Sequence, residues 1–164
     1  ACTEKKYDKA LGLIDAAIAS NSRHIGALSL KAFILRKMGK TEEALALASG
    51  IRALDPLDYW GTAEVMFSPL SANRNTLQDQ YRKTLAGKDQ DLLNVAIDYC
   101  AAGAYAEALD LLELFIPRGE HAALSPLLFY YAGYCCLRLD RNDRAGYFFN
   151  MAEKQPGASG KVRP

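Results

Sequence analysis

Apolar residues recur every three or four positions along most of the chain, which is the spacing of one face of an α-helix. The alternation of apolar and polar residues that is typical of strands is almost absent. Polar breaks, glycines and prolines divide the periodic stretches, as at Asn21-Ser22, Gly39 and Asp55-Pro56. The pattern predicts an all-α chain of about nine helices, over residues 4–20, 24–37, 41–54, 59–67, 75–87, 89–102, 105–115, 126–139 and 142–154.

One helix-opening phrase occurs three times, at residues 7–11, 41–45 and 105–109, and Ala10 and Ala44 lie 34 positions apart. The phrase belongs to a longer pattern of small and apolar positions over two helices. The first half of the pattern is read at Leu28, Lys31, Ala32 and Leu35, at Leu92, Val95, Ala96 and Tyr99, and at Phe129, Ala132, Gly133 and Cys136. The second half is read at Ala10 and Ile14, Ala44 and Ala48, Ala108 and Leu112, and Ala145 and Phe149.

This pattern resembles the tetratricopeptide repeat (TPR), a two-helix unit that buries its apolar face by stacking on neighbouring units. The chain is also similar to the repeat region of large bacterial proteins of unknown function. The resemblance implies an α-solenoid of antiparallel helix pairs, a TPR-like right-handed superhelix. It also implies a non-catalytic scaffold that binds proteins or peptides, and we expect a cytoplasmic location.

We expect a single array over residues 1–164, with two irregularities. Lys31 occupies a position that is usually apolar, and Asp140 replaces the inter-helix glycine present at Gly39 and Gly103. The first helix lacks a preceding partner, which suggests a fragment of a longer protein. The expected organisation is an orphan second helix (4–20), a repeat (24–56), a degenerate helix pair (57–88), two further repeats (89–117 and 125–156) and a tail (157–164).

Charge and composition exclude several classes of function. The 20 basic and 19 acidic residues give a net charge of +1, so the strong basic field of a nucleic-acid-binding protein is absent. The longest apolar stretch, residues 126–137, is shorter than the about 18 residues that a membrane-spanning helix needs. The four cysteines contain no Cys-x-x-Cys pair, so we expect buried or half-buried thiols in a reducing compartment.

No group of residues predicts catalysis. Gly39-Lys40-Thr41 matches only the end of a phosphate-binding loop, because Ile34 stands where the first glycine is required. His24 and His121 belong to no metal-binding pair, and His121 near Ser125 indicates a solvated loop rather than part of a triad. The three-residue spacing of Glu107, Asp110 and Glu113 predicts a solvated helix face. We therefore expect no enzyme activity, no cofactor and no metal.

The resemblance also implies a binding surface, because the first helix of each TPR lines a concave groove. Carried over by register, the groove would contain aromatic residues with a few cations at its rim, which suits a protein or peptide partner of unknown identity. Its residues would be Phe33, Arg36, Trp60, Phe67, Asn94, Ile97, Tyr130, Tyr134 and Arg138. Ser29 and Phe33 do not match the charged clamp that some TPR proteins use to hold a C-terminal carboxylate.

Two alternatives remain open. The chain would serve as a structural spacer or form a homo-oligomer through the end helix of residues 4–20, or it would be the accessory region of a carbohydrate-active enzyme whose aromatic residues stack on sugars.

Overall fold

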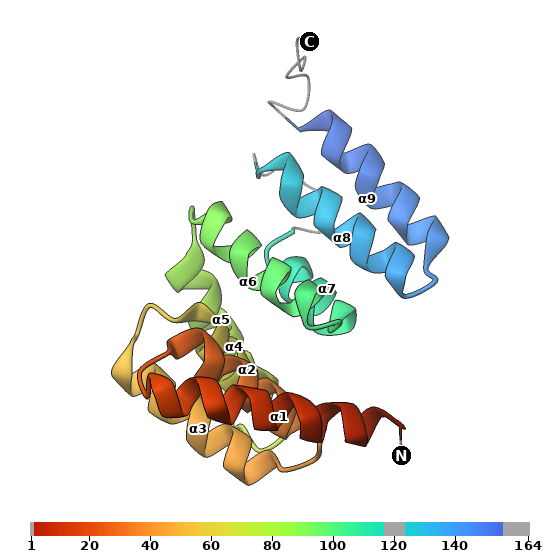
Figure 1. The fold of residues 1–164 in the computed structure, drawn as a ribbon. Coiled ribbons are helices and arrows are strands. Elements are labelled where there is room, and N and C mark those ends of the chain that lie inside the picture. The colour runs from red at the N-terminus through yellow and green to blue at the C-terminus, as the bar shows by residue number, and fades with distance from the viewer. Residues whose placement is uncertain (1, 117–123, 156–164) are drawn as a thin grey trace. The chain divides into compact units, whose positions relative to one another are not determined.

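The computed structural model describes residues 2–116 and 124–155, which contain nine helices and no strand (Figure 1). The predicted all-α fold is therefore confirmed over this part of the chain. The helices are α1 (Cys2–Ser20), α2 (Ile25–Lys37), α3 (Thr41–Leu54), α4 (Tyr59–Phe67), α5 (Arg74–Leu85), α6 (Asp89–Ala101), α7 (Tyr105–Glu113), α8 (Pro126–Arg138) and α9 (Asn142–Lys154).

The chain divides into two compact units, residues 1–81 and residues 82–164. We call them the first and second units and describe each by itself. In the first unit α2 packs against α1, α3 and α4, and in the second unit α8 packs against α6, α7 and α9. The predicted repeat borders fall between helices in both units, whereas the continuous array over residues 1–164 remains a prediction.

Three helix pairs, α2/α3, α6/α7 and α8/α9, are joined by turns of the same geometry. Each turn has one residue with a positive φ, at Gly39 (79°), Gly103 (75°) and Asp140 (58°). The amide of the following residue donates a long-range bond back to the helix, from Lys40 to the Leu35 carbonyl and equivalently in the other two turns. This double hydrogen-bonded ending is a Schellman motif. Asp140 therefore takes the backbone conformation of the glycine that it replaces.

The small residues of the repeated pattern lie where helices meet. Ala32, Ala48, Ala96, Ala108 and Ala132 have no exposed surface. A methyl side chain lets two helix backbones approach closely, and larger apolar residues fill the space beside it. The core of the first unit gathers Leu28, Ala32, Ala48, Ile51 and Val65, with Ile18, Ile25, Leu45, Leu47 and Leu77 partly buried against it.

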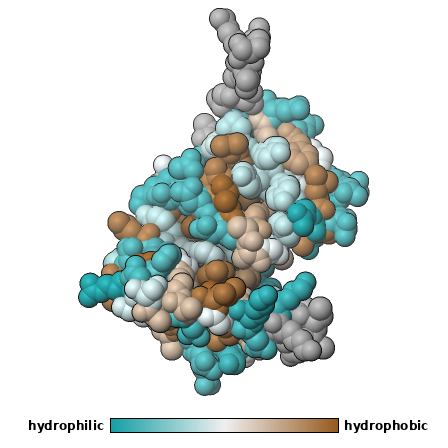
Figure 2. Space-filling model, viewed as in Figure 1, coloured by the Kyte–Doolittle hydropathy of each residue, from teal (hydrophilic) through white to brown (hydrophobic). Residues whose placement is uncertain are grey.

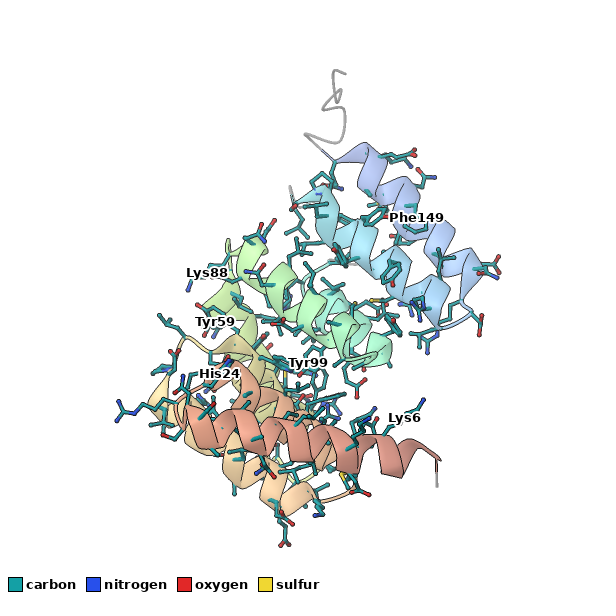
Figure 3. The ribbon with its side chains drawn as sticks, viewed as in Figure 1. Lys6, His24, Tyr59, Lys88, Tyr99 and Phe149 are labelled. Carbon is teal, nitrogen blue, oxygen red and sulfur yellow. The ribbon has the colours of Figure 1, made fainter. Side chains whose placement is uncertain are left out.

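Helices α8 and α9 approach so closely that a side chain at Gly133 would collide with α9. A Cβ atom placed there would lie 2.7 Å from the ring of Phe149, the α9 residue labelled in Figure 3. Glycine at this position of the repeat thus makes room for an aromatic ring on the next helix.

The span without the repeat pattern still contains two helices, α4 and α5. Asp58 caps α4 by accepting a 2.7 Å hydrogen bond from the Gly61 amide. Helix α4 packs against both α2 and α3, which is the place of the first helix of a following repeat. The Tyr81 hydroxyl donates a 3.0 Å hydrogen bond to the Tyr59 carbonyl and thereby ties α5 to the start of α4.

Some local expectations were wrong or fall outside the described residues. Glu107 is buried, so the acidic residues of α7 do not form one solvated face, and Glu113 is paired with Arg144 at 2.6 Å. Helix α7 ends at Glu113 rather than at residue 115. The Nδ1 atom of His24 accepts a 3.1 Å hydrogen bond from Ala27 and caps α2. His121, most of the 117–125 loop and the tail lie outside the described residues.

Candidate functional site: an aromatic hollow in the second unit

The second unit has a hollow of about 400 Å³ between α6 and α8. Both walls come from one face of a helix, because the residues on each helix are three or four positions apart or adjacent to such a pair. Helix α6 contributes Ile97, Cys100 and Ala101, and helix α8 contributes Tyr130, Tyr131 and Tyr134. We call this site the aromatic hollow.

The tyrosines of the hollow hold one another in a chain of edge-to-face contacts. Ring centroids are 6.0 Å apart for Tyr130 and Tyr131, 6.4 Å for Tyr131 and Tyr134, and 5.9 Å for Tyr134 and Tyr105. Tyr130 also contacts Phe149 of α9 at 5.6 Å. Such ring pairs stabilise each other beyond the area that they bury, so the walls of the hollow are ordered before any ligand arrives.

One cation borders the hollow. The Arg138 guanidinium lies over the Tyr105 ring, 4.4 Å from its centroid, and donates a 3.1 Å hydrogen bond to the Tyr134 hydroxyl. This hydrogen bond raises the pKa of Arg138, so the side chain remains charged at any physiological pH. Arg138 is exposed, and its charge is therefore available to a ligand at the edge of the hollow.

Four of the nine residues expected in a groove thus meet in the second unit: Ile97, Tyr130 and Tyr134 in the hollow and Arg138 beside it. Asn94, the fifth residue of this unit, is exposed on α6 and accepts a 2.9 Å hydrogen bond from Gln90. It does not line the hollow.

The other expected residues lie in the first unit, where they form a packed cluster. The Arg36 guanidinium lies 5.7 Å from the centroids of both the Phe33 and Phe67 rings. Phe33 is only 2% exposed, Phe67 is half-buried, and Trp60 on α4 is 9% exposed. These side chains therefore contribute mainly to the interior of the first unit.

Arg36 is held by a buried carboxylate. Its Nε atom donates to Glu64 Oε2 at 2.7 Å and a second guanidinium nitrogen donates to Oε1 at 3.2 Å, so the pair is bidentate. The two side chains are 12% and 2% exposed. Glu64 neutralises Arg36 and joins α2 to α4, a role that the groove register did not predict.

A second polar link runs between the same two helices. The Ser29 hydroxyl donates to Asp58 Oδ2 at 2.8 Å. Burial raises the pKa of the Asp58 carboxyl, although the hydrogen bonds from Ser29 and Gly61 act in the opposite direction. Ser29, which the resemblance placed in a groove, is fully buried.

Sequence reasoning did not identify Cys100 and Ala101 as lining residues or Tyr105 as the platform for Arg138. The available signal was periodicity, because Ile97, Cys100 and Ala101 share one face of α6. Cys100 and Ala101 were overlooked because small side chains are normally assigned to helix packing.

The described residues contain no group of three or more histidine, cysteine or acidic side chains able to hold a metal ion. Within the same ranges, no helix is both long and apolar enough to cross a membrane. On the face shown in Figure 2, hydrophobic side chains form separate strips among hydrophilic ones rather than one broad patch.

No protein-family model matches the chain. No curated protein matches it either. Among solved structures, a thermophilic TPR protein of Thermus thermophilus is 19% identical, with a TM-score of 0.46 over 96% of this chain and 87% of that one. A double mutant of MamA is 10% identical, with a TM-score of 0.46 over 90% and 84% of the two chains, and a crystal structure of MamA is 12% identical, with a TM-score of 0.45 over 93% and 84%.

These likenesses are too weak to carry an argument, and the fold rests on the chain's own features. Three helix pairs end their first helices in the same Schellman turn, and the alanines of the repeated pattern are buried between helices. Together they make this an all-α protein built from TPR-like helix pairs.

Proposed function

We propose that the chain is a non-catalytic scaffold that binds a protein segment or peptide, and that the aromatic hollow is its contact site. The observation that carries the proposal is the hollow itself, an open space of about 400 Å³ walled by three tyrosines and an isoleucine. Rigid aromatic rings give up little conformational entropy on binding and bury a large area, which is why they dominate the energetics of many interfaces.

The surroundings of the hollow fit a peptide with an apolar anchor. Tyr130 is 53% exposed, and Leu127, one helical turn before it, is 49% exposed, so apolar surface continues past the hollow along α8. Arg138 lies two turns after Tyr131 on the same helix and adds a positive charge. An apolar side chain seated among the tyrosines, with a carbonyl or acidic group toward Arg138, satisfies both features.

The experiment begins with a random peptide library displayed on phage and selected against the full chain. Selected peptides are synthesised and their affinities are measured by calorimetry. We expect Tyr130→Ala to weaken binding by about tenfold or more, because loss of an aromatic anchor typically costs more than 1 kcal/mol. Tyr130 is largely exposed, so its truncation leaves the helical content unchanged.

Tyr147→Ala provides the matched control, since Tyr147 is 52% exposed and lies on α9 outside the hollow. This variant should bind the selected peptides with wild-type affinity. Equal affinities for wild type, Tyr130→Ala and Tyr134→Ala would remove the hollow as the binding site. Trp60→Ala is less informative, because its side chain is buried and its truncation perturbs the first unit.

Self-association through α1 is the second candidate function. Leu13 is 68% exposed on this helix, and among the described helices α1 packs only against α2. An exposed apolar residue on an end helix is a usual site for contact with a second copy. Light scattering would show an increase in mass with concentration that Leu13→Glu abolishes. A constant monomer mass at high concentration would dismiss this candidate.

A further inference from the structure

Two thiols from different helices meet at the wall of the aromatic hollow. The sulfur of Cys100 on α6 lies 3.4 Å from the sulfur of Cys135 on α8. The two residues are 35 positions apart in the chain, so their contact results from the packing of α6 against α8. The distance is that of a hydrogen-bonded thiol pair, in which neither sulfur is oxidised.

The two sulfurs differ in their access to solvent. Cys100 is half-buried and lines the hollow, whereas Cys135 has no exposed surface. A small solute entering the hollow therefore meets Cys100 first, and Cys135 lies behind it. This is the arrangement of an attacking thiol with a second thiol in reserve.

Their environments also differ in charge. The hydrogen bond from Cys135 lowers the pKa of the Cys100 thiol, and the positive charge of Arg138 lowers it further against the opposing effect of burial. The same hydrogen bond and burial raise the pKa of Cys135. The thiolate, which is the nucleophilic form of cysteine, thus forms more readily on the exposed member of the pair.

Cys136 follows Cys135 directly but lies in different surroundings. It is fully buried, and the charges that influence it are those of Arg144, Glu113 and Arg141 rather than Arg138. Because successive residues on a helix point about 100° apart, Cys136 faces away from Cys100. It supplies an internal control for a buried cysteine that is not part of the pair.

We propose that Cys100 and Cys135 form a two-cysteine oxidation site in which Cys100 reacts with hydrogen peroxide or a small organic hydroperoxide entering the aromatic hollow, and Cys135 resolves the product to a disulfide. The proposal concerns the thiols alone and holds whether or not the hollow binds a peptide.

The reaction proceeds in two steps. The Cys100 thiolate attacks one oxygen of hydrogen peroxide, the O–O bond breaks, and the leaving hydroxide takes up a proton to become water; Cys100 is now a sulfenic acid. The Cys135 sulfur then attacks the Cys100 sulfur, the S–O bond breaks, and a second water leaves with the Cys135 proton. Overall, two thiols and one peroxide give one disulfide and two waters, and the peroxide is the oxidant.

The geometry permits the second step with little movement. A disulfide has a sulfur–sulfur distance of about 2.05 Å, so the two atoms must approach by roughly 1.4 Å, which side-chain rotation and a small shift of α6 against α8 provide. The bond would tie together the two helices that wall the hollow. Oxidation would therefore fix the spacing of the walls.

The test treats the full chain, carrying Cys2→Ser to remove the remaining thiol, with hydrogen peroxide. Cys100 and Cys135 fall in different tryptic peptides, because Arg118 lies between them. We expect an intact mass lower by two hydrogens and a non-reduced digest in which these two peptides are linked. Adding Cys136→Ala should leave the linked peptides in place and identify Cys135 as the partner.

Single variants separate the two roles. Cys135→Ala should stop the reaction at the sulfenic acid, which dimedone traps on Cys100, and Cys100→Ala should abolish both the disulfide and the dimedone adduct. Circular dichroism confirms that each variant is folded. Cys100 remaining reduced in the folded wild-type chain, or a mapped disulfide between any other two sulfurs, would overturn the proposal.

Discussion

Single residues set the turns between paired helices. A positive φ costs a residue with a Cβ atom roughly 1 to 2 kcal/mol, and glycine avoids that cost. Gly39 and Gly103 follow this rule, while Asp140 adopts a φ of 58° with a side chain that tolerates the conformation better than most. The repeat therefore preserves the backbone conformation of the turn even where its usual residue is absent.

Gly103→Ala tests this reading, with Gly50→Ala as its control. A Cβ atom meets nothing within 4 Å at either position, but only Gly103 has a positive φ, of 75°. We expect Gly103→Ala to lower the free energy of unfolding by about 1 kcal/mol and Gly50→Ala, inside α3, to raise it by about 0.5 to 1 kcal/mol. Urea titration measures both. Shifts of the same sign would show that backbone strain does not decide the outcome at Gly103.

Helix by helix, the side-chain links described here join the first helix of one pair to the first helix of the next. Arg36 reaches Glu64 from α2 to α4, and Cys100 contacts Cys135 from α6 to α8, with sequence separations of 28 and 35 residues. Stacked repeats place equivalent helices side by side, so positions about one repeat apart face each other.

The ion pair between α2 and α4 makes the prediction at this scale. Arg36→Met should destabilise the chain by about 3 to 5 kcal/mol, because it leaves the Glu64 carboxylate buried without its guanidinium. The double variant Arg36→Met with Glu64→Leu should recover most of that loss, since apolar side chains replace both charges. Lys31→Met, which breaks the exposed pair with Asp15, should cost less than about 1 kcal/mol. Additive losses in the double variant would contradict the coupling.

The helices were predictable because their determinants are local. Apolar spacing, Gly39 and Gly103 at turns and Pro126 at a helix start each act within a few residues. The links between helices were not predictable in the same way. Arg36 was expected at the rim of a groove, but its role depends on Glu64, which carries no repeat signal and lies on the helix of the degenerate span. The aromatic hollow was anticipated in part, because Tyr130 and Tyr134 lie on the exposed face of a first helix.

Over the whole molecule, the candidate site belongs to one of the two units. The six residues that line the aromatic hollow all come from the second unit, whereas the Arg36–Glu64 pair belongs to the first. The residues for binding and for the buried ion pair are thus separate in the chain. A change in the interior of the first unit leaves the walls of the hollow chemically unaltered.

Gly61→Ala tests this separation. A Cβ atom at Gly61 would lie 2.6 Å from Asp58 Oδ2 and 2.9 Å from a methyl carbon of Ile51, so the variant should lose about 1 to 3 kcal/mol of stability. We expect hydrogen exchange to rise in α3 and α4 while the affinity for a selected peptide stays at the wild-type value. A parallel loss of peptide affinity, at a temperature where the variant is folded, would show that the hollow depends on the first unit.

The short reach of the links between helices also bears on how the chain acquires its structure. The side-chain bonds between consecutive first helices join residues between 28 and 36 positions apart. Closing a loop of this size costs little entropy, and proteins dominated by such near-sequence pairings fold quickly. A ribosome has to release only a little more than one helix pair before the next link forms. The chain is therefore suited to fold progressively from its amino end during synthesis, with each new helix pair adding to the one before it.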